Sequence, residues 1–600
     1  MAKKLIYRPI ILDTLRKYDR KTLMDDLFAG VTVGFLALPL AMVFAIACNL
    51  PPERGLFTAI VAGFLAAVFG GSRVQVTGPT GAFVLLISGI AAEFGYAGLV
   101  YCTLLAAVIL IVMGLTKMGS LVKFIPFPVT TGFTTGIAVV IFSTQIKDLL
   151  GLKIESVPGD FIPKWTSYVQ NIGSISISAT AVAILTIAVI VVLKKKFPKW
   201  PAILISMIVA TVVAYFLNLP VDTIGSRFGD LPRTLPSPGL PAFDFTQFKT
   251  LIAPAFTVAM LGAIESLLSA TVSDGMIGAR HRSNTELIGQ GIANIGSAFF
   301  GGIPATGAIA RTATNVKSGG KTPVSAIIHA IVLALIMLIF GRYAKMVPMA
   351  ALAGILVVVS YNMSEIWRFF SMFKAPKSDL AVLLLTFILT VFVDLTLAVE
   401  VGLILSAAMF IKRMADVTKI GVVTRELRDM PESSKGDPNS IANREVPDGV
   451  GVFEINGPFF FGAVEKFKDY MGVLDQPLQV VILRIRHVPA IDASGLNVIE
   501  DLMLRCRKKG AALIISGVHT QPLFALQKSG LLAEIGQENV VSNIDTALNR
   551  AREILGLPQV TPVNPANIQT EPLVPTNTEQ APAAAENTGT DEPETQAADN

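Results

Sequence analysis

Long apolar stretches follow one another from Asp26 to about Met414, whereas the chain from Thr418 to Asn600 has the mixed polarity of water-soluble proteins. Runs of about 17 to 25 predominantly apolar residues predict helices that cross a lipid bilayer. The pattern predicts about 14 such segments, several of them short or interrupted by Gly and Pro. The segments centre on residues 33–47, 56–69, 81–92, 99–115, 131–142, 177–193, 201–217, 254–270, 287–299, 307–316, 324–340, 349–360, 380–393 and 397–411.

Composition agrees with a membrane protein and argues against a soluble enzyme. Hydrophobic residues make up 52% of the chain and charged residues 16%, while soluble proteins carry about 25% charged residues. The 3 cysteines and 4 histidines are too scattered for a disulfide framework or a metal site. No nucleophile–base pair and no phosphate-binding loop is evident in the sequence. We therefore expect no enzymatic activity, no cofactor and no bound metal.

Basic residues near the ends of the apolar segments predict the orientation, because cytoplasmic loops carry an excess of Lys and Arg. With a cytoplasmic N-terminus, every even-numbered segment ends inside the cell. From the sixth segment on, each even-numbered segment is followed by basic residues. They are Lys194, Lys195, Lys196 and Lys199 after the sixth, Arg280 and Arg282 after the eighth, Lys317 and Lys321 after the tenth, Arg368 and Lys374 after the twelfth, and Lys412 and Arg413 after the fourteenth. We expect a multi-pass protein of the inner (plasma) membrane with the N-terminal segment 1–22 and the soluble end in the cytoplasm. Because their place beside apolar spans explains the basic residues, we expect no nucleic-acid partner.

The two halves of the membrane region share a short motif. Divided evenly, about 14 segments give two sets of seven, and an odd-numbered repeat inserts its second copy upside down. Phe69-Gly70-Gly71 precedes the third segment, which opens with Pro79-Thr80-Gly81-Ala82. Phe300-Gly301-Gly302 precedes the tenth, which opens with Ala305-Thr306-Gly307-Ala308. The recurrence predicts an inverted repeat.

These two short segments each begin at a Gly/Pro break inside the membrane, which predicts an anion site. The first N–H groups of a helix have no intrahelical partner, and the helix dipole places partial positive charge there. Two such ends near the midplane would bind an anion at residues 81–82 and 307–310. Thr80 and Thr306 could cap the helices or contact the anion. The alternative is that the glycines only allow close helix packing.

Two ionisable residues lie within the predicted spans, where they are costly and typically functional. Arg311 follows the second break and could bind the anion or raise the local potential; alternatively, it pairs with an acidic neighbour. Glu265 lies midway along the eighth segment, and its protonation while an anion is bound would couple transport to protons. A purely structural, hydrogen-bonded Glu265 is the other possibility.

Several motifs resemble the SulP sulfate-permease family, also called solute carrier family twenty-six. In the first half they are Asp26–Gly34, Leu38-Pro39, Pro51–Leu56 and Val76–Pro79. In the second half they are Glu286–Gly291, Gly301–Pro304 and Ala310–Asn315, within the stretch from Asn284 to Gly320. The resemblance covers residues from about 8 to about 550 and is specific, since the motifs occur together.

The resemblance implies a polytopic α-helical fold of seven-plus-seven inverted repeats with a core and a gate domain, and a homodimer. It implies an anion held between the first, third and tenth segments. By position, the substrate-binding residues would be Phe44, Thr80, Gly81, Ala82, Gly307, Ala308, Ile309, Ala310 and Arg311. Glu265 matches the acidic position that bacterial members use for ion coupling, which favours protons over sodium.

The soluble end alternates predicted strands and helices, which indicates a small α/β domain. Ile491–Leu496 resembles the strand-to-helix turn of STAS domains, in which a serine can be phosphorylated. Ser494 is therefore a candidate regulatory residue, although Asp492 or Ser494 could simply cap the following helix. The predicted domains are the membrane transport domain 23–414, a linker 415–448, the STAS domain 449–555 and a disordered acidic tail 556–600.

The function that we predict is secondary active transport of an anion by alternating access, as proton-coupled symport of sulfate or a C4-dicarboxylate. One alternative within the family is a bicarbonate or chloride transporter or exchanger. A nucleobase transporter would share the fold, but Arg311 argues against it, since such a site should hold carboxylates for ring N–H groups. In a different class, the membrane part would be a scaffold or sensor that signals through the STAS domain.

Overall fold

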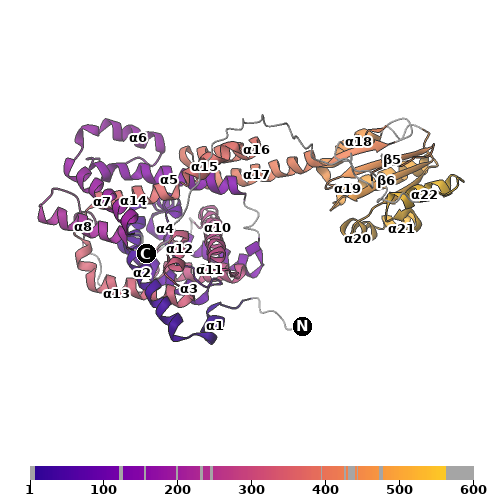
Figure 1. The fold of residues 1–600 in the computed structure, drawn as a ribbon. Helices are drawn as coiled ribbons and strands as arrows, with labels where there is room; N and C mark the ends of the chain where they lie inside the picture. Colours follow the sequence, from indigo (N-terminus) through magenta and orange to yellow (C-terminus); the bar gives the residue numbers. More distant parts are fainter. Residues whose placement is uncertain are drawn as a thin grey trace, which may run out of the picture. The chain divides into compact units, whose positions relative to one another are not determined.

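The computed structural model describes residues 7–120, 126–154, 157–197, 200–229, 234–242, 248–393, 395–423, 428–429, 440–441, 444–471 and 477–561. The chain divides into two compact units, Met1–Ala407 and Ala408–Asn600, whose elements are labelled in Figure 1. The predicted acidic tail lies outside the described residues from position 562 onward, and much of the predicted linker lies outside them as well.

The described chain up to residue 417 is mainly helical, and each predicted apolar segment coincides with a helix except for at most two residues at its ends. The helices are α1 (Ile11–Thr14), α2 (Arg20–Ala47), α3 (Pro52–Phe69), α4 (Ala82–Leu115), α5 (Phe127–Leu150), α6 (Phe161–Gln170), α7 (Ile177–Lys196), α8 (Ala202–Phe216), α9 (Ile224–Phe228), α10 (Ile252–Ile277), α11 (Ser283–Phe299), α12 (Ile309–Lys317), α13 (Pro323–Ala344), α14 (Met349–Met363), α15 (Ile366–Ser371), α16 (Lys377–Phe392) and α17 (Leu395–Val417). In the described part of the chain, 8 helices are long and apolar enough to cross a membrane. The polytopic helical fold is thus confirmed, while the number of about 14 crossings stays a prediction.

The third and fourth predicted segments are confirmed as two helices, which join at a kink and share the label α4. Gly95 lies between them with φ 67° and ψ −178°, outside the helical region. Glycine adopts positive φ without the steric cost of a Cβ, so the chain changes direction there without leaving its path for a separate loop.

Proline and glycine set several helix boundaries. Pro52 stands at the start of α3 and Pro323 at the start of α13, where the missing N–H costs no intrahelical bond. Gly151 ends α5 and Gly278 ends α10, both with a left-handed backbone at φ 63° and 65°. Such caps let each helix stop where the chain must turn.

Helix contacts in the first half have counterparts in the second. α4 packs on α11 as α13 packs on α3, and α2 packs on α13 as α10 packs on α4. Likewise, α5 packs on α16 as α14 packs on α7. Matching α2 with α10, α3 with α11, α4 with α13, α5 with α14 and α7 with α16 turns the first contact of each pair into the second. This reciprocity is what an inverted repeat produces.

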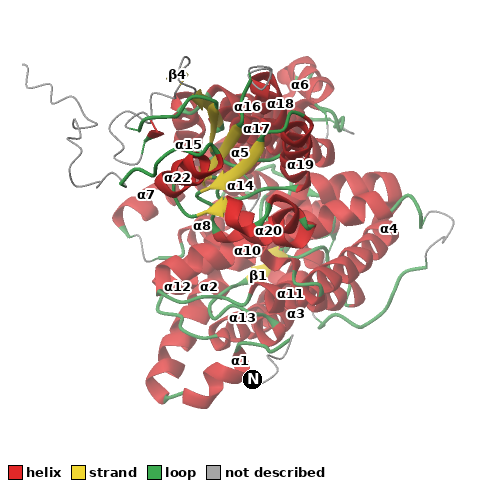
Figure 2. Ribbon diagram, turned by 90° about the vertical axis from the view of Figure 1, so that its right-hand side faces the viewer, coloured by secondary structure: helices red, strands yellow, loops and turns green. Residues whose placement is uncertain are grey.

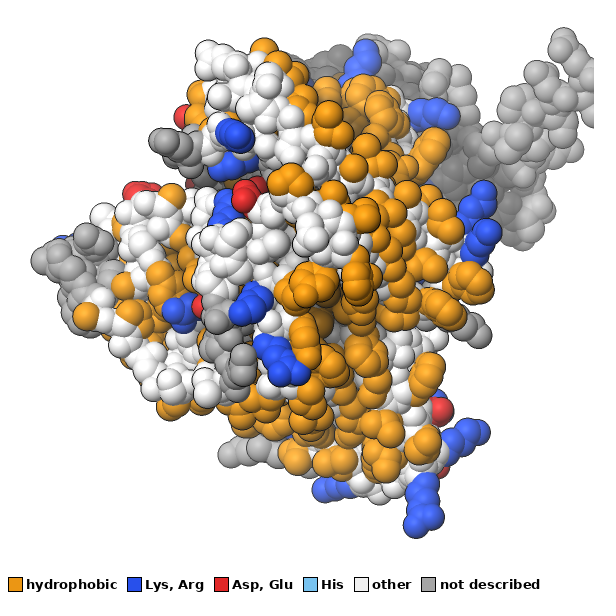
Figure 3. All heavy atoms as spheres, turned by 90° about the vertical axis from the view of Figure 1, so that its left-hand side faces the viewer, with side chains coloured by type: hydrophobic (Ala, Val, Ile, Leu, Met, Phe, Trp, Pro, Cys, Tyr) orange, Lys and Arg blue, Asp and Glu red, His pale blue; other side chains and the backbone are white. Residues whose placement is uncertain are grey.

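Apolar side chains cover much of the surface of the first unit (Figure 3). The view faces the side on which α7, α8 and α13 lie in Figure 1. Large exposed hydrophobic residues on these three helices are Ile184, Val191, Val192, Ile208, Val212, Tyr215, Phe216, Ile331, Leu335, Leu338, Ile339 and Phe340. Exposed apolar patches of this extent are unusual for soluble proteins and mark a membrane surface here.

The second unit is an α/β domain, as predicted. Its sheet has the strand order β4-β3-β5-β6-β7-β8, in which β5 to β8 are parallel and β3 is antiparallel to β5 (Figures 1 and 2). The strands are β3 (Lys419–Val423), β4 (Arg428–Asp429), β5 (Val450–Asn456), β6 (Val480–His487), β7 (Ala512–Ser516) and β8 (Val540–Val541). The helices are α18 (Phe461–Tyr470), α19 (Ala493–Lys508), α20 (Thr520–Ser529), α21 (Leu531–Ile535) and α22 (Ile544–Ile554).

A buried ion pair joins the two central strands of this sheet. Arg484 on β6 and Glu454 on β5 are register partners, and their Nη1 and Oε2 atoms are 3.2 Å apart. Burial raises the pKa of Glu454 and lowers that of Arg484, and each group partly offsets the shift of the other. The pair thus places opposite charges face to face at matched register positions of the two strands.

Candidate functional site

The two predicted breaks meet in a short antiparallel ladder. β1 (Thr77–Gly78) pairs with β2 (Thr306–Gly307), so that Thr77 lies opposite Gly307 and Gly78 opposite Thr306. α4 begins at Ala82 and α12 at Ile309, each shortly after its strand. Because the strands are antiparallel, the two helices leave the ladder in opposite directions. The helix starts that the sequence motif predicted thus lie together, beside α3 and α10 (Figure 2).

Both helix starts present backbone N–H groups that precede the first helical turn. In α4 the first bonds run from Phe83 N to Thr80 O at 3.3 Å and from Val84 N to Gly81 O at 3.0 Å. In α12 the first bond runs from Thr312 N to Ala308 O at 2.9 Å. Before that bond, Gly307 N donates to the Ser266 hydroxyl at 3.1 Å and Ala308 N to Val76 O at 2.9 Å. The first-turn amides of residues 309–311, together with the two helix dipoles, are therefore the groups that favour negative charge at α12.

The accessible part of this region is narrow. Ile309 and Ala310 at the start of α12 are exposed, and Thr80 and Glu265 are partly exposed. In contrast, Gly81, Ala82, Gly307, Ala308 and Arg311 are buried. A ligand could therefore reach the first residues of α12 and the Thr80 side chain directly. The buried residues would determine the shape and the electrostatic potential of the site without being exposed themselves.

α10 contacts both breaks through consecutive residues. Glu265 accepts a hydrogen bond of 2.9 Å from the Thr80 hydroxyl, next to the first break. Ser266 shares a hydrogen bond of 2.8 Å with Thr306 and accepts one of 3.1 Å from Gly307 N, at the second break. Glu265, which the sequence analysis assigned to proton coupling, therefore lies next to the start of α4.

Arg311 links α12 to the first break. Its side chain is 2% exposed, and its Nη2 donates to the carbonyl oxygen of Pro79. The guanidinium also lies against Gly78, where an added Cβ would come 2.5 Å from Nη1. Nη1 itself has no hydrogen-bond partner among the described residues. Within those residues no acidic side chain lies within ion-pair distance of Arg311, but Glu265 is near enough to interact with it electrostatically, so pairing with an acidic neighbour stays an alternative.

α5 and α14 face the first helix start from the other side. A Cβ on Gly81 would lie 2.6 Å from the sulfur of Met363 and 3.4 Å from Cδ1 of Ile141. Phe44 on α2 is 6% exposed and belongs to the same apolar cluster as Ala82 and Ile141. The site is thus enclosed by helices from both halves of the chain.

Sequence reasoning missed the residues that hold the loop before the first break. Glu286 accepts hydrogen bonds from Gly71 N at 2.7 Å, Ser72 N at 3.0 Å and the Gln75 side chain at 3.0 Å. Gln290 donates to Glu286 at 2.8 Å and to Thr77 at 2.7 Å. Because Glu286 is a carboxylate in the first turn of a membrane helix, the rule that singled out Glu265 could also have singled it out.

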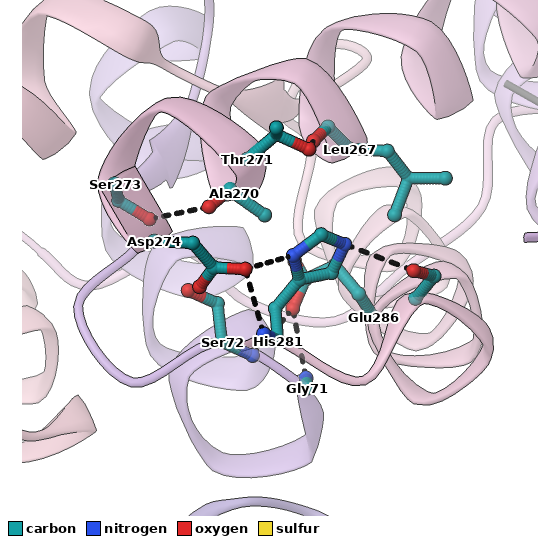
Figure 4. A network of polar contacts seen from close by, with 10 residues as sticks. Gly71, Ser72, Leu267, Ala270, Thr271, Ser273, Asp274, His281 and Glu286 are labelled. Carbon is teal, nitrogen blue, oxygen red and sulfur yellow. Dashed lines mark hydrogen bonds and ion pairs between the residues drawn. The ribbon is translucent and has the colours of Figure 1, made fainter. Parts of the chain in front are cut away.

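Figure 4 shows the surroundings of Glu286. The His281 ring lies beside it, with Nδ1 2.7 Å from a carboxylate oxygen of Asp274 and Nε2 2.9 Å from the Ser283 hydroxyl. Asp274 also accepts from the backbone N–H of His281 at 2.8 Å. These contacts tie the end of α10 to the start of α11, beside the loop that Glu286 binds.

An arginine holds the corresponding loop of the second half. Arg54 at the start of α3 donates to Gly301 O at 2.9 Å and to the Tyr96 hydroxyl at 3.1 Å. Tyr96 in turn donates to Gly302 O at 3.1 Å. Thr58, one turn further along α3, accepts from Ile303 N at 2.7 Å. Each Phe-Gly-Gly loop is therefore held by a charged side chain near the start of a helix from the other half.

In the second unit, Ser494 is partly exposed in the first turn of α19. The helix is capped by Asp492, whose carboxylate accepts from Gly495 N at 2.8 Å. Of the two predicted capping residues, the structure thus shows Asp492 in that role. Within the described residues no group of three or more His, Cys, Asp or Glu side chains is arranged to hold a metal ion.

Comparisons with known proteins agree with these features. The model of the sulfate permease family matches residues 23–386, and that of the STAS domain matches residues 442–547. The putative sulfate transporter YvdB of Bacillus subtilis is 40% identical over 531 residues, which cover 88% of this chain and 98% of that protein. The bicarbonate transporter BicA of a Picosynechococcus strain is 30% identical, over 90% of this chain and 96% of its own length.

A solved structure has the same fold at low identity. The murine anion transporter Slc26a9 in its inward-facing state superimposes with a TM-score of 0.81 at 20% identity, over 91% of this chain and 94% of that chain. Fold, family model and full-length relatives point the same way. The chain belongs to the sulfate permease family and is a multi-pass membrane transporter of anions, not an enzyme, with a C-terminal STAS domain.

Proposed function

We propose that this protein is a proton-coupled symporter of sulfate or a C4-dicarboxylate that works by alternating access. The observation that carries the proposal is the contact between Glu265 and Thr80. It places a proton-accepting group beside the helix end that we assign to the anion, so that the charges of the two ligands interact directly.

The substrate would lie between the two helix starts. Phe44, Thr80, Gly81 and Ala82 would line one side. The other side would be formed by residues 307–311 of the second half. Backbone N–H groups would donate to the anion oxygens, and the buried Arg311 would raise the potential while holding Pro79 in place. Such donors suit a tetrahedral sulfate or a carboxylate, since both accept several hydrogen bonds at once.

Electrostatics supply the reason for coupling. Moving one uncompensated charge across the membrane involves about 2.3 kcal/mol per 100 mV, so a divalent anion is opposed by an inside-negative potential. An ionised Glu265 beside the anion would add repulsion. A proton on Glu265 removes that repulsion and carries compensating charge inward, so the anion and the proton favour each other's binding.

Purified protein in liposomes tests the proposal. Uptake of radiolabelled sulfate, succinate, bicarbonate and chloride is compared with and without an inward proton gradient. We expect sulfate or succinate uptake that the gradient stimulates. Uptake that ignores the gradient and requires an anion inside the vesicle would favour the bicarbonate or chloride exchanger, a possibility supported by the relative named for bicarbonate. No uptake of any anion would favour a scaffold that signals through the STAS domain.

Glu265→Gln separates coupling from structure. The amide keeps an acceptor for the Thr80 hydroxyl but does not bind a proton at these pH values. We expect anion binding to persist while stimulation by the proton gradient is lost. Glu93→Gln is the matched control, because Glu93 is an exposed carboxylate on α4. If stimulation survives in Glu265→Gln, the carboxylate is structural.

We also propose the placement that the basic residues predicted, with segment 1–22 and the STAS domain, residues 449–555, in the cytoplasm. The family resemblance supports a homodimer, and Ser494, which is partly exposed, would be the regulatory site. Cysteine labelling from either side of sealed vesicles, at position 494 and at Asn218, tests the orientation. Ser494→Cys should label only from the cytoplasmic side.

A further inference from the structure

A crevice between α8 and α13 has an apolar part and a polar part that adjoin. The apolar part is a cavity of about 600 Å³ whose lining residues carry no charge; it includes Met42 from α2, Met207 from α8 and Met337 from α13. The polar part, of about 660 Å³, is lined by Asn218, Thr223 and Lys345, among others. Tyr215 and Met346 line both parts, so the two adjoin at these residues.

The apolar part opens toward the surface that faces the membrane. Val212, Tyr215 and Phe340 line it and are 45%, 58% and 55% exposed. They belong to the apolar surface of α7, α8 and α13 seen in Figure 3. Along α13 the lining extends from Ile336 to Ala344, a distance of about 12 Å at the rise of an α-helix. An elongated hydrocarbon chain in contact with the bilayer therefore fits this space in shape and in polarity.

The polar part lies where α13 ends, and Lys345 is the charged residue among its described lining residues. Lys345 is exposed, and Arg342, one turn earlier, stacks on the Tyr343 ring at 4.5 Å. α9 fixes this end, because Gly225 N donates to Lys345 O and Ile224 N to Val347 O, both at 2.9 Å. Lys345 thus projects from a backbone that is held on both sides, beside the hydroxyl of Thr223 and the amide of Asn218. This combination suits a phosphate group.

We propose that the crevice binds one anionic glycerophospholipid, with an acyl chain in the apolar part and the phosphate at Lys345. A transported anion is excluded from the apolar part, since its lining offers almost no donors. A second protein is a poorer fit, because the apolar part opens toward lipid. The order of the two parts, apolar toward the membrane core and cationic toward its surface, is the order of a phospholipid.

The position of the crevice gives the lipid a consequence for transport. α8 packs mainly on α7 and also contacts α2 and α14, whereas α13 packs mainly on α2 and α3. A lipid between α8 and α13 would therefore contact two groups of helices whose main packing partners differ. If those groups shift against each other during alternating access, as our proposed function requires, the lipid favours the arrangement in which the crevice is open. Binding itself does not depend on that function and is tested without a transport assay.

The full-length protein is purified in detergent, mixed with dioleoyl phosphatidylglycerol or dioleoyl phosphatidylcholine, and analysed by native mass spectrometry. We expect one phosphatidylglycerol to stay bound in wild type, with phosphatidylcholine retained about tenfold less well, a difference of about 1.4 kcal/mol. Lys345→Gln should remove this preference, and Lys345→Arg should keep it. Val212→Trp fills the exposed mouth of the apolar part and should reduce retention of both lipids.

Two matched controls guard against general effects. Lys374→Gln removes an exposed cation elsewhere, and Ile184→Trp adds the same bulk on α7, outside the crevice. Both should bind lipid as wild type does, and all variants should elute as intact protein. If wild type, Val212→Trp and Lys345→Gln retain the same lipid in the same amount, the lipid is only part of the general annulus and the proposal is wrong. Equal retention of the two lipids by wild type would overturn the assignment of the phosphate to Lys345.

Discussion

Arg54 and Glu286 perform the same task with opposite charges, each holding a Phe-Gly-Gly loop of the other half. Arg54 donates to a carbonyl, Gly301 O, at 2.9 Å, and Glu286 accepts from an amide, Gly71 N, at 2.7 Å. An inverted repeat presents the two loops to these helices in opposite senses, so that one loop offers acceptors and the other donors. The charges follow that difference, and both loops lead directly to the helix starts of the candidate site.

We expect Glu286→Gln to destabilise the protein. The carboxylate accepts from two backbone amides and two side-chain amides, and a glutamine would turn donors toward donors. A hydrogen bond to a charged group contributes about 1.5–3 kcal/mol, so the loss should lower the thermal unfolding midpoint and anion uptake together. Glu365→Gln, which removes an exposed carboxylate paired with Arg368, is the control and should change little. An unchanged midpoint in Glu286→Gln would show that the loop holds without it.

Gly78→Ala should impair anion binding by displacing Arg311. The new Cβ would meet the guanidinium at 2.5 Å, a contact that must be relieved by moving the arginine or the ladder. Overpacking of this kind costs about 1–3 kcal/mol. Gly89→Ala on α4 is the matched control, since nothing lies within 4 Å of its Cβ position, and alanine there should stabilise by about 0.5–1 kcal/mol. Isothermal titration with the transported anion distinguishes the two; equal affinities would contradict the role of this contact.

Arg311→Ala tests the electrostatic role of the arginine. We expect anion affinity to fall by on the order of 1.5–3 kcal/mol, which is about 10-fold to 150-fold in dissociation constant. Arg311→Lys should recover part of the affinity, because it restores the charge without the two-pronged donor. A variant that folds, as judged by its elution and unfolding midpoint, yet binds the anion normally would make Arg311 a purely structural link to Pro79.

The attachment of the N-terminal segment should depend on pH. Arg282 donates to the Asp13 carboxylate and, with Arg8, holds the pKa of that group below its ordinary value of 3.8. A depressed pKa contributes stability at pH values above 3.8, and that contribution is lost as the pH falls through the lowered value. Hydrogen exchange of α1 amides should therefore speed up below about pH 4, beyond the intrinsic pH effect. Asp13→Asn should show weak protection at every pH, whereas Asp469→Asn, with an exposed carboxylate in the second unit, should behave like wild type.

The fold was predictable from sequence where the signal is local. Apolar runs located every membrane helix, and alternating strands and helices located the α/β domain. At Gly95 the two predicted helices meet directly at a kink, and the sequence did not show whether a loop would separate them. A single glycine is compatible with a loop and with a kink, because both use the same freedom of the backbone.

The candidate site was predictable only in part. The repeated motif identified both helix starts, because glycine and proline mark breaks in apolar runs. The ladder of β1 and β2 has two residues in each strand, too few for any alternation to appear. The contacts of Glu286 and Arg54 join residues 215 and 247 positions apart, and no local pattern encodes such pairings. The two helix starts could be predicted from the sequence, but the contacts that hold the loops before them could not.

Because Glu265 and Ser266 are adjacent, α10 is connected to both helix starts through consecutive residues. Adjacent residues on a helix move as one body, so a displacement that breaks the bond to Thr80 also disturbs the bond to Thr306. Proton arrival at one carboxylate would then reach both repeats in a single step, and the two halves could not respond at different times. Coupling of this kind needs no relay of side chains across the membrane, only the stiffness of one helical turn.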